Sequence, residues 1–73
     1  MKAKQKNNLM QSVYETLTKQ EQRKLARHIS QKGNLKLTER ETNLNVNTIK
    51  RAAAGMQVTL ISAQSLRQFI TNN

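Results

Sequence analysis

Apolar residues recur at helical spacing near the start of the chain, with polar residues between them. Residues three or four positions apart lie on one face of an α-helix, so this spacing predicts a helix over residues 8–17. Either Asn7 or Asn8 can cap it. The apolar face must pack within the chain or against another copy, and it consists of Leu9, Met10, Val13, Tyr14 and Leu17.

A second helix is predicted to begin after Thr18, because Thr18 and Glu21 have the spacing of a capping box. We expect it to run to about Lys32, where Gly33 can adopt the left-handed conformation that ends helices. Its apolar face holds Leu25, Ala26 and Ile29, and its basic face holds Lys19, Arg23 and Arg27. The basic face is either a solvated surface or a contact with a phosphate backbone. His28 has no nucleophile or carboxylate beside it and receives no functional role.

The middle of the chain predicts two short helices joined by a tight turn. A second capping box at Thr38–Glu41 predicts the start of the first helix. Asparagine tolerates left-handed backbone geometry and caps helices well, so we expect a turn at Asn43–Leu44 and a helix cap at Asn45. The second helix covers residues 46–54, and Gly55 ends it.

The last part of the chain predicts an extended segment and one more helix. Residues 56–61 are rich in β-branched and apolar side chains, and Ser62 then caps a helix. Its inward-facing side chains are Leu66, Phe69 and Ile70. The sequence has no internal repeat and no linker rich in Gly, Ser or Pro. We expect an all-α fold, a small bundle of about five short helices in one domain over residues 8–73, after a basic flexible arm over residues 1–7.

Composition adds a strong positive charge. The 73 residues include 13 Lys and Arg against 4 Asp and Glu, which gives a formal net charge of +9 and a pI near 10.8. Neutralising phosphates releases condensed counterions, so such a chain has affinity for nucleic acid. A double-stranded target is favoured, because the only aromatic residues, Tyr14 and Phe69, fall on apolar helix faces and leave no platform for unpaired bases.

Other residue types exclude several classes of function. The chain has no cysteine and one histidine, so neither a disulfide framework nor a thiolate metal site is expected. A chain this short buries one modest core without an internal substrate cavity, so we expect no enzyme, no cofactor and no metal. The apolar runs are far shorter than a membrane span, and the N-terminus lacks the apolar core of a secretory signal. We therefore expect no membrane partner and a cytoplasmic, nucleoid-associated location.

The two helices on either side of Asn43 have the pattern of a helix-turn-helix unit, whose second helix enters the major groove of DNA. Their shared inward face is predicted to contain Leu44, Ile49 and Ala52 or Ala53. Asparagine can bond adenine in a bidentate manner, arginine can do the same with guanine, and threonine or lysine can hold a phosphate. The outward-facing candidates for DNA binding are Asn45, Asn47, Thr48, Lys50 and Arg51.

The segment Asn45–Gly55 resembles the recognition helix of the Cro/repressor-type (XRE-like, lambda-repressor-like) family, with a cap, a Thr-Ile pair, a basic residue and a final glycine. Ser62–Ile70 is similar to the next helix of that family, and the resemblance covers roughly residues 35–70. It implies that the protein binds operator DNA as a dimer through the second helix. When Asn43 is aligned with the turn glycine of the family, Thr38 replaces an apolar residue and Glu39 a small one.

Together these patterns predict a sequence-specific protein for double-stranded DNA, a small transcriptional regulator, a repressor, of phage or mobile-element type. Helix 8–17 or the last helix can supply the face of a homodimer. Two alternatives remain. One is a DNA-bending or excisionase-like accessory protein, and the other is a basic interaction module or inhibitor that binds an acidic protein partner.

Overall fold

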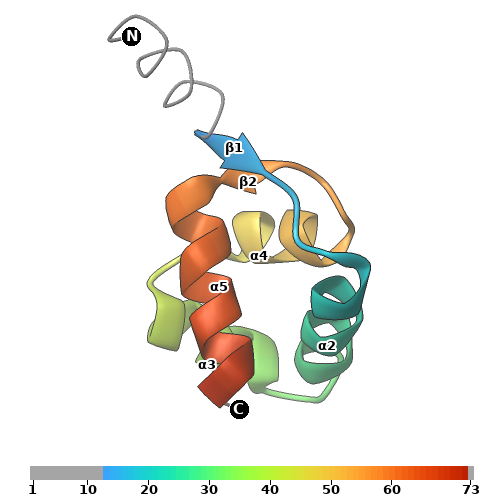
Figure 1. The fold of residues 1–73 in the computed structure, drawn as a ribbon. Coiled ribbons are helices and arrows are strands. Elements are labelled where there is room, and N and C mark those ends of the chain that lie inside the picture. Colours follow the sequence, from blue (N-terminus) through green and yellow to red (C-terminus); the bar gives the residue numbers. More distant parts are fainter. Residues whose placement is uncertain (1–12, 73) are drawn as a thin grey trace, which may run out of the picture.

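The structure, a computed structural model, describes residues 13–72 and contains four helices and a two-stranded sheet (Figure 1). The antiparallel sheet pairs Tyr14 with Thr59 and Glu15 with Val58. In chain order the elements are β1 (Tyr14–Glu15), α2 (Lys19–Ile29), α3 (Asn34–Thr42), α4 (Val46–Ala53), β2 (Val58–Thr59) and α5 (Leu60–Asn72). The described part is thus a small, mostly helical domain with four helices where we expected about five in the whole chain.

The prediction of a helix over residues 8–17 is wrong for its second half. Val13 lies in a turn, and Tyr14 and Glu15 form β1. The carbonyl of Val13 accepts a hydrogen bond from the backbone N–H of Leu60 at 2.6 Å. Pairing with a segment distant in sequence therefore overrides the local helical spacing. Residues 8–12 of that helix and the basic arm over residues 1–7 lie outside the described residues.

The capping box at the start of α2 is confirmed. The Thr18 hydroxyl accepts the backbone N–H of Glu21 at 3.1 Å, and the Glu21 carboxylate accepts the backbone N–H of Thr18 at 2.9 Å. The helix ends at Ile29 and not near Lys32, because the Ser30 hydroxyl donates to the carbonyl of Arg27 at 2.8 Å. Side-chain capping of this kind satisfies carbonyls that a further helical turn would otherwise occupy.

The burial of Ala26 and the position of Gly33 also differ from the expectation. Ala26 is exposed and does not share the buried face of Leu25. Gly33 is left-handed, with φ 85°, but it immediately precedes α3 and does not end α2.

The first turn of α3 forms at Asn34, so the predicted capping box at Thr38 is wrong. Thr38 lies inside the helix and is fully buried, and its hydroxyl donates to the carbonyl of Asn34 at 2.7 Å. A threonine that hydrogen-bonds back into its own helix can occupy a core position at little cost. Thr38 is thus a polar residue at a core position, and the neighbouring Glu39 is half-buried.

The cap of α5 is also one turn earlier than predicted. The Thr59 hydroxyl accepts the backbone N–H of Ser62 at 3.1 Å, which is the geometry of an N-cap. Ser62 itself is buried within the helix, and its hydroxyl oxygen accepts a hydrogen bond from the Thr59 hydroxyl at 2.8 Å. The extended segment predicted for residues 56–61 is thus limited to the two residues of β2.

The core lies where α2, α3, α4 and α5 meet, with β1 and β2 at one end (Figure 1). The predicted inward positions Ile49, Ala52, Leu66 and Phe69 are buried. The fully packed cluster consists of Leu17, Leu25, Ile49, Ala52, Val58, Ala63 and Leu66. Leu44, Ala53 and Ile70 are partly buried against it.

Arg67 of α5 joins three elements of the fold through ion pairs. Its guanidinium contacts Glu15 of β1, and its Nε donates to the Glu21 carboxylate of α2 at 3.0 and 3.1 Å. Burial alone raises the pKa of Glu21, but hydrogen bonds from the Thr18 backbone and from Arg67, with the charge of Arg67, bring that pKa below its ordinary value of 4.5. The interaction with Glu15, opposed by burial and reinforced by Glu21, raises the pKa of Arg67.

We expect Arg67→Gln to lower the free energy of unfolding near neutral pH by about 1 kcal/mol, because two partly exposed carboxylates lose their cation. The folded pKa of Glu21 lies below the unfolded one, so its contribution is present above the unfolded pKa and is lost as pH falls through the folded pKa. The variant should therefore lose less stability between about pH 5 and pH 3 than the parent in urea titrations. Lys24→Gln changes an exposed lysine outside these ion pairs. This control should lose as much free energy of unfolding as the parent does over the same pH range.

Candidate nucleic-acid interface

Three residues connect α3 to α4 and fix the angle at which α4 leaves the turn. Asn43 is the single described non-glycine residue with positive φ, at φ 59° and ψ 27°. Leu44 is partly buried against the core, and its backbone N–H donates to the Thr42 hydroxyl at 3.3 Å. Asparagine tolerates the left-handed conformation better than most side chains, so the predicted turn at Asn43–Leu44 is confirmed.

The helix α4 is bounded at both ends as predicted. At its start, Oδ1 of Asn45 accepts the backbone N–H of Thr48 at 2.8 Å. Beyond its end, Gly55 has φ 84°, and a Cβ there would lie 2.8 Å from Oε1 of Gln22. The backbone after α4 therefore packs closely against α2, which holds the helix in a defined position.

One face of α4 is buried and the opposite face is exposed. Ile49 and Ala52 have no exposed surface, whereas Asn47, Lys50 and Arg51 are exposed. These three residues follow the spacing i, i+3 and i+4, so they share one helix face. Thr48 is half-buried at the edge of that face, and Asn45 is exposed at the cap. The structure thus brings three of the five predicted site residues together on one surface.

The hydrogen bonds of these side chains limit what each can do. The carbonyl oxygen of Asn45 is already used in the cap, so only its NH₂ group remains free to donate. Nη2 of Arg51 donates to the carbonyl of Gln57 at 3.4 Å, a long bond that leaves most of the guanidinium available. The side chains of Asn47 and Lys50 make no hydrogen bond or ion pair with another described residue.

The sequence interpretation missed Ala54 as part of this surface. Ala54 is exposed at the C-cap of α4, on the face of Asn47 and Lys50. Its spacing of seven residues from Asn47 could have revealed this, since positions i and i+7 share a helix face. Its side chain adds a small apolar group to the end of the exposed face.

Charge on the described surface is largely uncompensated and positive. Among the described residues only Arg67 forms ion pairs, and it engages two of the four carboxylates in the chain. The predicted basic face of α2 is exposed at Lys19, Arg23 and Arg27. No acidic residue lies on α4. A polyanion is therefore the ligand class that this surface favours.

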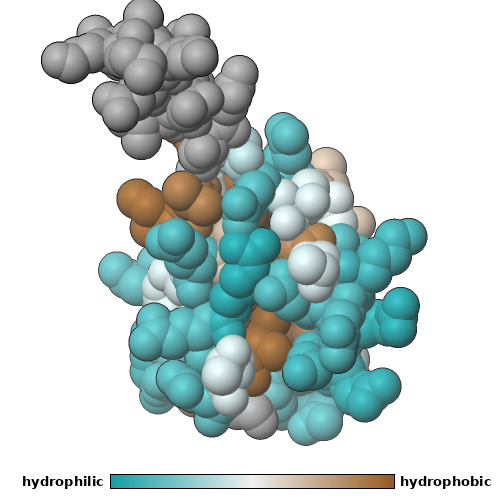
Figure 2. Space-filling view, in the orientation of Figure 1, coloured by the Kyte–Doolittle hydropathy of each residue, from teal (hydrophilic) through white to brown (hydrophobic). Residues whose placement is uncertain are grey.

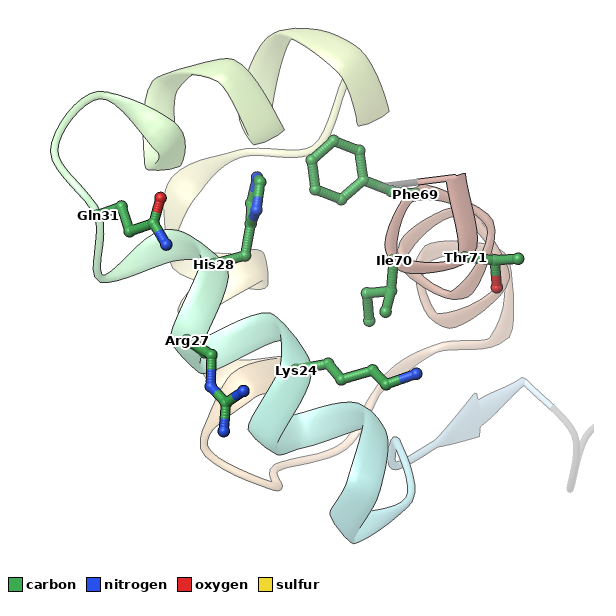
Figure 3. Close-up of a pocket in the computed structure, with 7 residues that line it drawn as sticks. All are labelled: Lys24, Arg27, His28, Gln31, Phe69, Ile70 and Thr71. Atoms are coloured by element: carbon green, nitrogen blue, oxygen red, sulfur yellow. The ribbon is translucent and has the colours of Figure 1, made fainter.

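A groove of about 390 Å³ separates the end of α2 from the end of α5 (Figure 3). The His28 ring meets the Phe69 ring edge-on, with centroids 5.1 Å apart and an angle of 75° between the planes. Lys24 extends across towards the end of α5, whereas Arg27 points away. Nε2 of His28 is buried without a hydrogen-bond partner. Phe69 and Ile70 thus give the groove an apolar wall, and no residue of α4 lines it.

Two other kinds of site were sought in residues 13–72. No group of three or more His, Asp or Glu side chains there is placed to hold a metal ion. No helix in this part of the chain has the length and apolar character needed to cross a membrane.

No protein-family model, no curated protein and no solved structure matches this chain.

We expect Asn45→Ala to lower the free energy of unfolding by about 1 kcal/mol, because the N–H of Thr48 loses its cap. Asn47→Ala is the matched control two residues later, where no cap is lost and alanine favours the helix, so stability should stay equal or rise slightly. Urea denaturation followed by circular dichroism measures both. Equal losses in the two variants would contradict the capping role of Asn45.

We expect His28→Phe to raise the free energy of unfolding by about 0.5–1 kcal/mol, because it keeps a ring beside Phe69 and removes an unpaired buried nitrogen. His28→Ala, which removes the ring contact as well, should destabilise the protein. A loss of stability in His28→Phe would contradict a net cost of the unpaired Nε2 atom.

Proposed function

We propose that this protein binds double-stranded DNA in a sequence-dependent manner, with the exposed face of α4 in the major groove. The observation that carries the proposal is the division of α4 into a buried face at Ile49 and Ala52 and an exposed face at Asn47, Lys50 and Arg51. The major groove, about 12 Å wide, admits one such helix. The left-handed turn at Asn43 and the packing of α3 on α4 support the assignment of a helix-turn-helix unit.

The exposed side chains have distinct roles in this proposal. Arg51 donates to O6 and N7 of a guanine, and Asn47, whose amide is unoccupied, bonds the N6 and N7 edge of an adenine. Lys50 and Thr48 hold phosphates. The cap hydrogen bond fixes the amide of Asn45 at the start of α4, and its NH₂ group donates to a phosphate.

The resemblance of Asn45–Gly55 to Cro/repressor-type recognition helices favours a small transcriptional repressor that acts as a homodimer at the nucleoid in the cytoplasm. Two copies then read two half-sites about one helical turn apart. The exposed basic face of α2 favours a second candidate, an accessory protein that bends DNA by contacting its backbone. An acidic protein bound by the same charge is the third.

Selection of bound duplexes from a random pool at about 0.15 M salt distinguishes these candidates, since counterion-driven binding is reduced there. We expect a palindromic motif. Arg51→Ala should lower affinity for the selected duplex by about 10- to 100-fold and relax one base position, because a bidentate contact is lost. Lys24→Ala is the control, an exposed lysine beside the α2–α5 groove, and it should leave the motif unchanged.

Three results would oppose the assignment of α4. If Arg51→Ala selects the same motif as the parent, α4 does not read the bases. If no motif emerges and affinity falls steeply with salt, the protein binds DNA through its backbone alone. If no duplex is retained, an acidic protein becomes the favoured partner.

A further inference from the structure

Large apolar side chains are exposed together at the end of the molecule formed by β1, β2 and the first turn of α5. Ile61 is 74% exposed and Tyr14 is 56% exposed, and Val13, next to Tyr14 in the chain, is also exposed. The pairing of Tyr14 with Thr59, and of Val13 with Leu60, brings the start of β1 beside the residues that lead into Ile61. Figure 2 shows hydrophobic surface gathered over the start of α5, near β1. We call Val13, Tyr14 and Ile61 the apolar end.

A charge-free helix face continues from the apolar end. Gln64 and Gln68 are exposed on α5 and follow Ile61 at positions i+3 and i+7, so the three share one face. No charged residue occurs between Met56 and Leu66, and the one charged residue of α5, Arg67, is neutralised by Glu15 and Glu21. By contrast, α2, α3 and α4 all carry exposed Lys or Arg side chains.

This distribution of charge favours a second copy of the same chain as the partner that covers the apolar end. Two molecules with a net charge of +9 repel each other wherever their basic surfaces meet, and they approach at least cost where both surfaces are uncharged. Patches of exposed apolar residues on small proteins mark interaction sites. A two-fold contact is self-complementary, so one patch serves both partners.

We infer that the apolar end and the outer face of α5 form the homodimer surface, with Ile61 of each copy close to the two-fold axis. The choice of a second copy also rests on the proposed function, in which two α4 helices bind two half-sites. Three exposed apolar side chains make a small interface, so the dimer is weak and the amount of protein sets the fraction of dimer.

Sedimentation equilibrium of the full chain without DNA tests this surface. The parent should show a monomer–dimer equilibrium, and Ile61→Lys should weaken it at least about tenfold, because two lysines would meet at the axis. Leu37→Lys is the matched control, since Leu37 is an exposed large apolar residue on α3, away from the apolar end. It should leave the equilibrium unchanged.

A charge exchange makes the test specific to the two-fold arrangement. Ile61→Glu should also remove the dimer, and a mixture of the Ile61→Lys and Ile61→Glu chains should restore it as a heterodimer. Circular dichroism checks that each variant is folded. If a variant at Ile61 does not fold, Tyr14→Lys tests the same surface in its place. The inference is overturned if the parent is monomeric throughout, as expected if residues 1–12 of the same chain cover the apolar end. It is also overturned if Leu37→Lys acts like Ile61→Lys, or if mixing restores nothing.

The failure of this inference and the failure of the proposed function give different results. Ile61→Lys should keep the affinity of the monomer for a single half-site, whereas Arg51→Ala should lose that affinity and keep the dimer. A dimer that persists in Ile61→Lys refutes the surface and leaves the role of α4 intact.

Discussion

Burial of Ile49 and Ala52 decides which side chains of α4 face the solvent. Both are completely buried among residues from α2, α5 and β2, and the small alanine lets the helices approach closely. The caps at Asn45 and Gly55 set where the helix begins and ends, but the two buried residues set its rotation about its own axis. Every contact proposed for Asn47, Lys50 and Arg51 depends on that rotation.

The elements predicted correctly are those whose hydrogen bonds are local. Thr18 with Glu21, Asn45 with Thr48, and the left-handed Asn43 each involve residues within one turn, and the sequence motif carries the geometry. Some errors arise where a nearby residue takes the predicted role, as when Thr59 caps α5 in place of Ser62. Another arises where distant segments pair. Tyr14 has helical spacing, yet its partner is Thr59 in a remote strand, and no local pattern reports such a pairing.

For the candidate surface residues too, local spacing could be predicted and contacts between segments could not. Helical spacing alone placed Asn47, Lys50 and Arg51 on one exposed face, because the period of a helix is fixed. It could not show that the Asn45 oxygen is occupied, that Arg51 reaches Gln57, or that Arg67 gathers Glu15 and Glu21. These contacts depend on how loops and helices pack, and the two ion pairs of Arg67 link residues far apart in the chain.

The left-handed Asn43 has a consequence for the speed of binding. Together with the Asn45 cap and the packing of Gln22 against Gly55, it holds α4 in place in the free protein. In the proposed complex, DNA therefore meets a surface already formed, and no backbone has to be ordered during the encounter. The association rate is then set by diffusion and by the attraction of opposite charges, and not by a folding step.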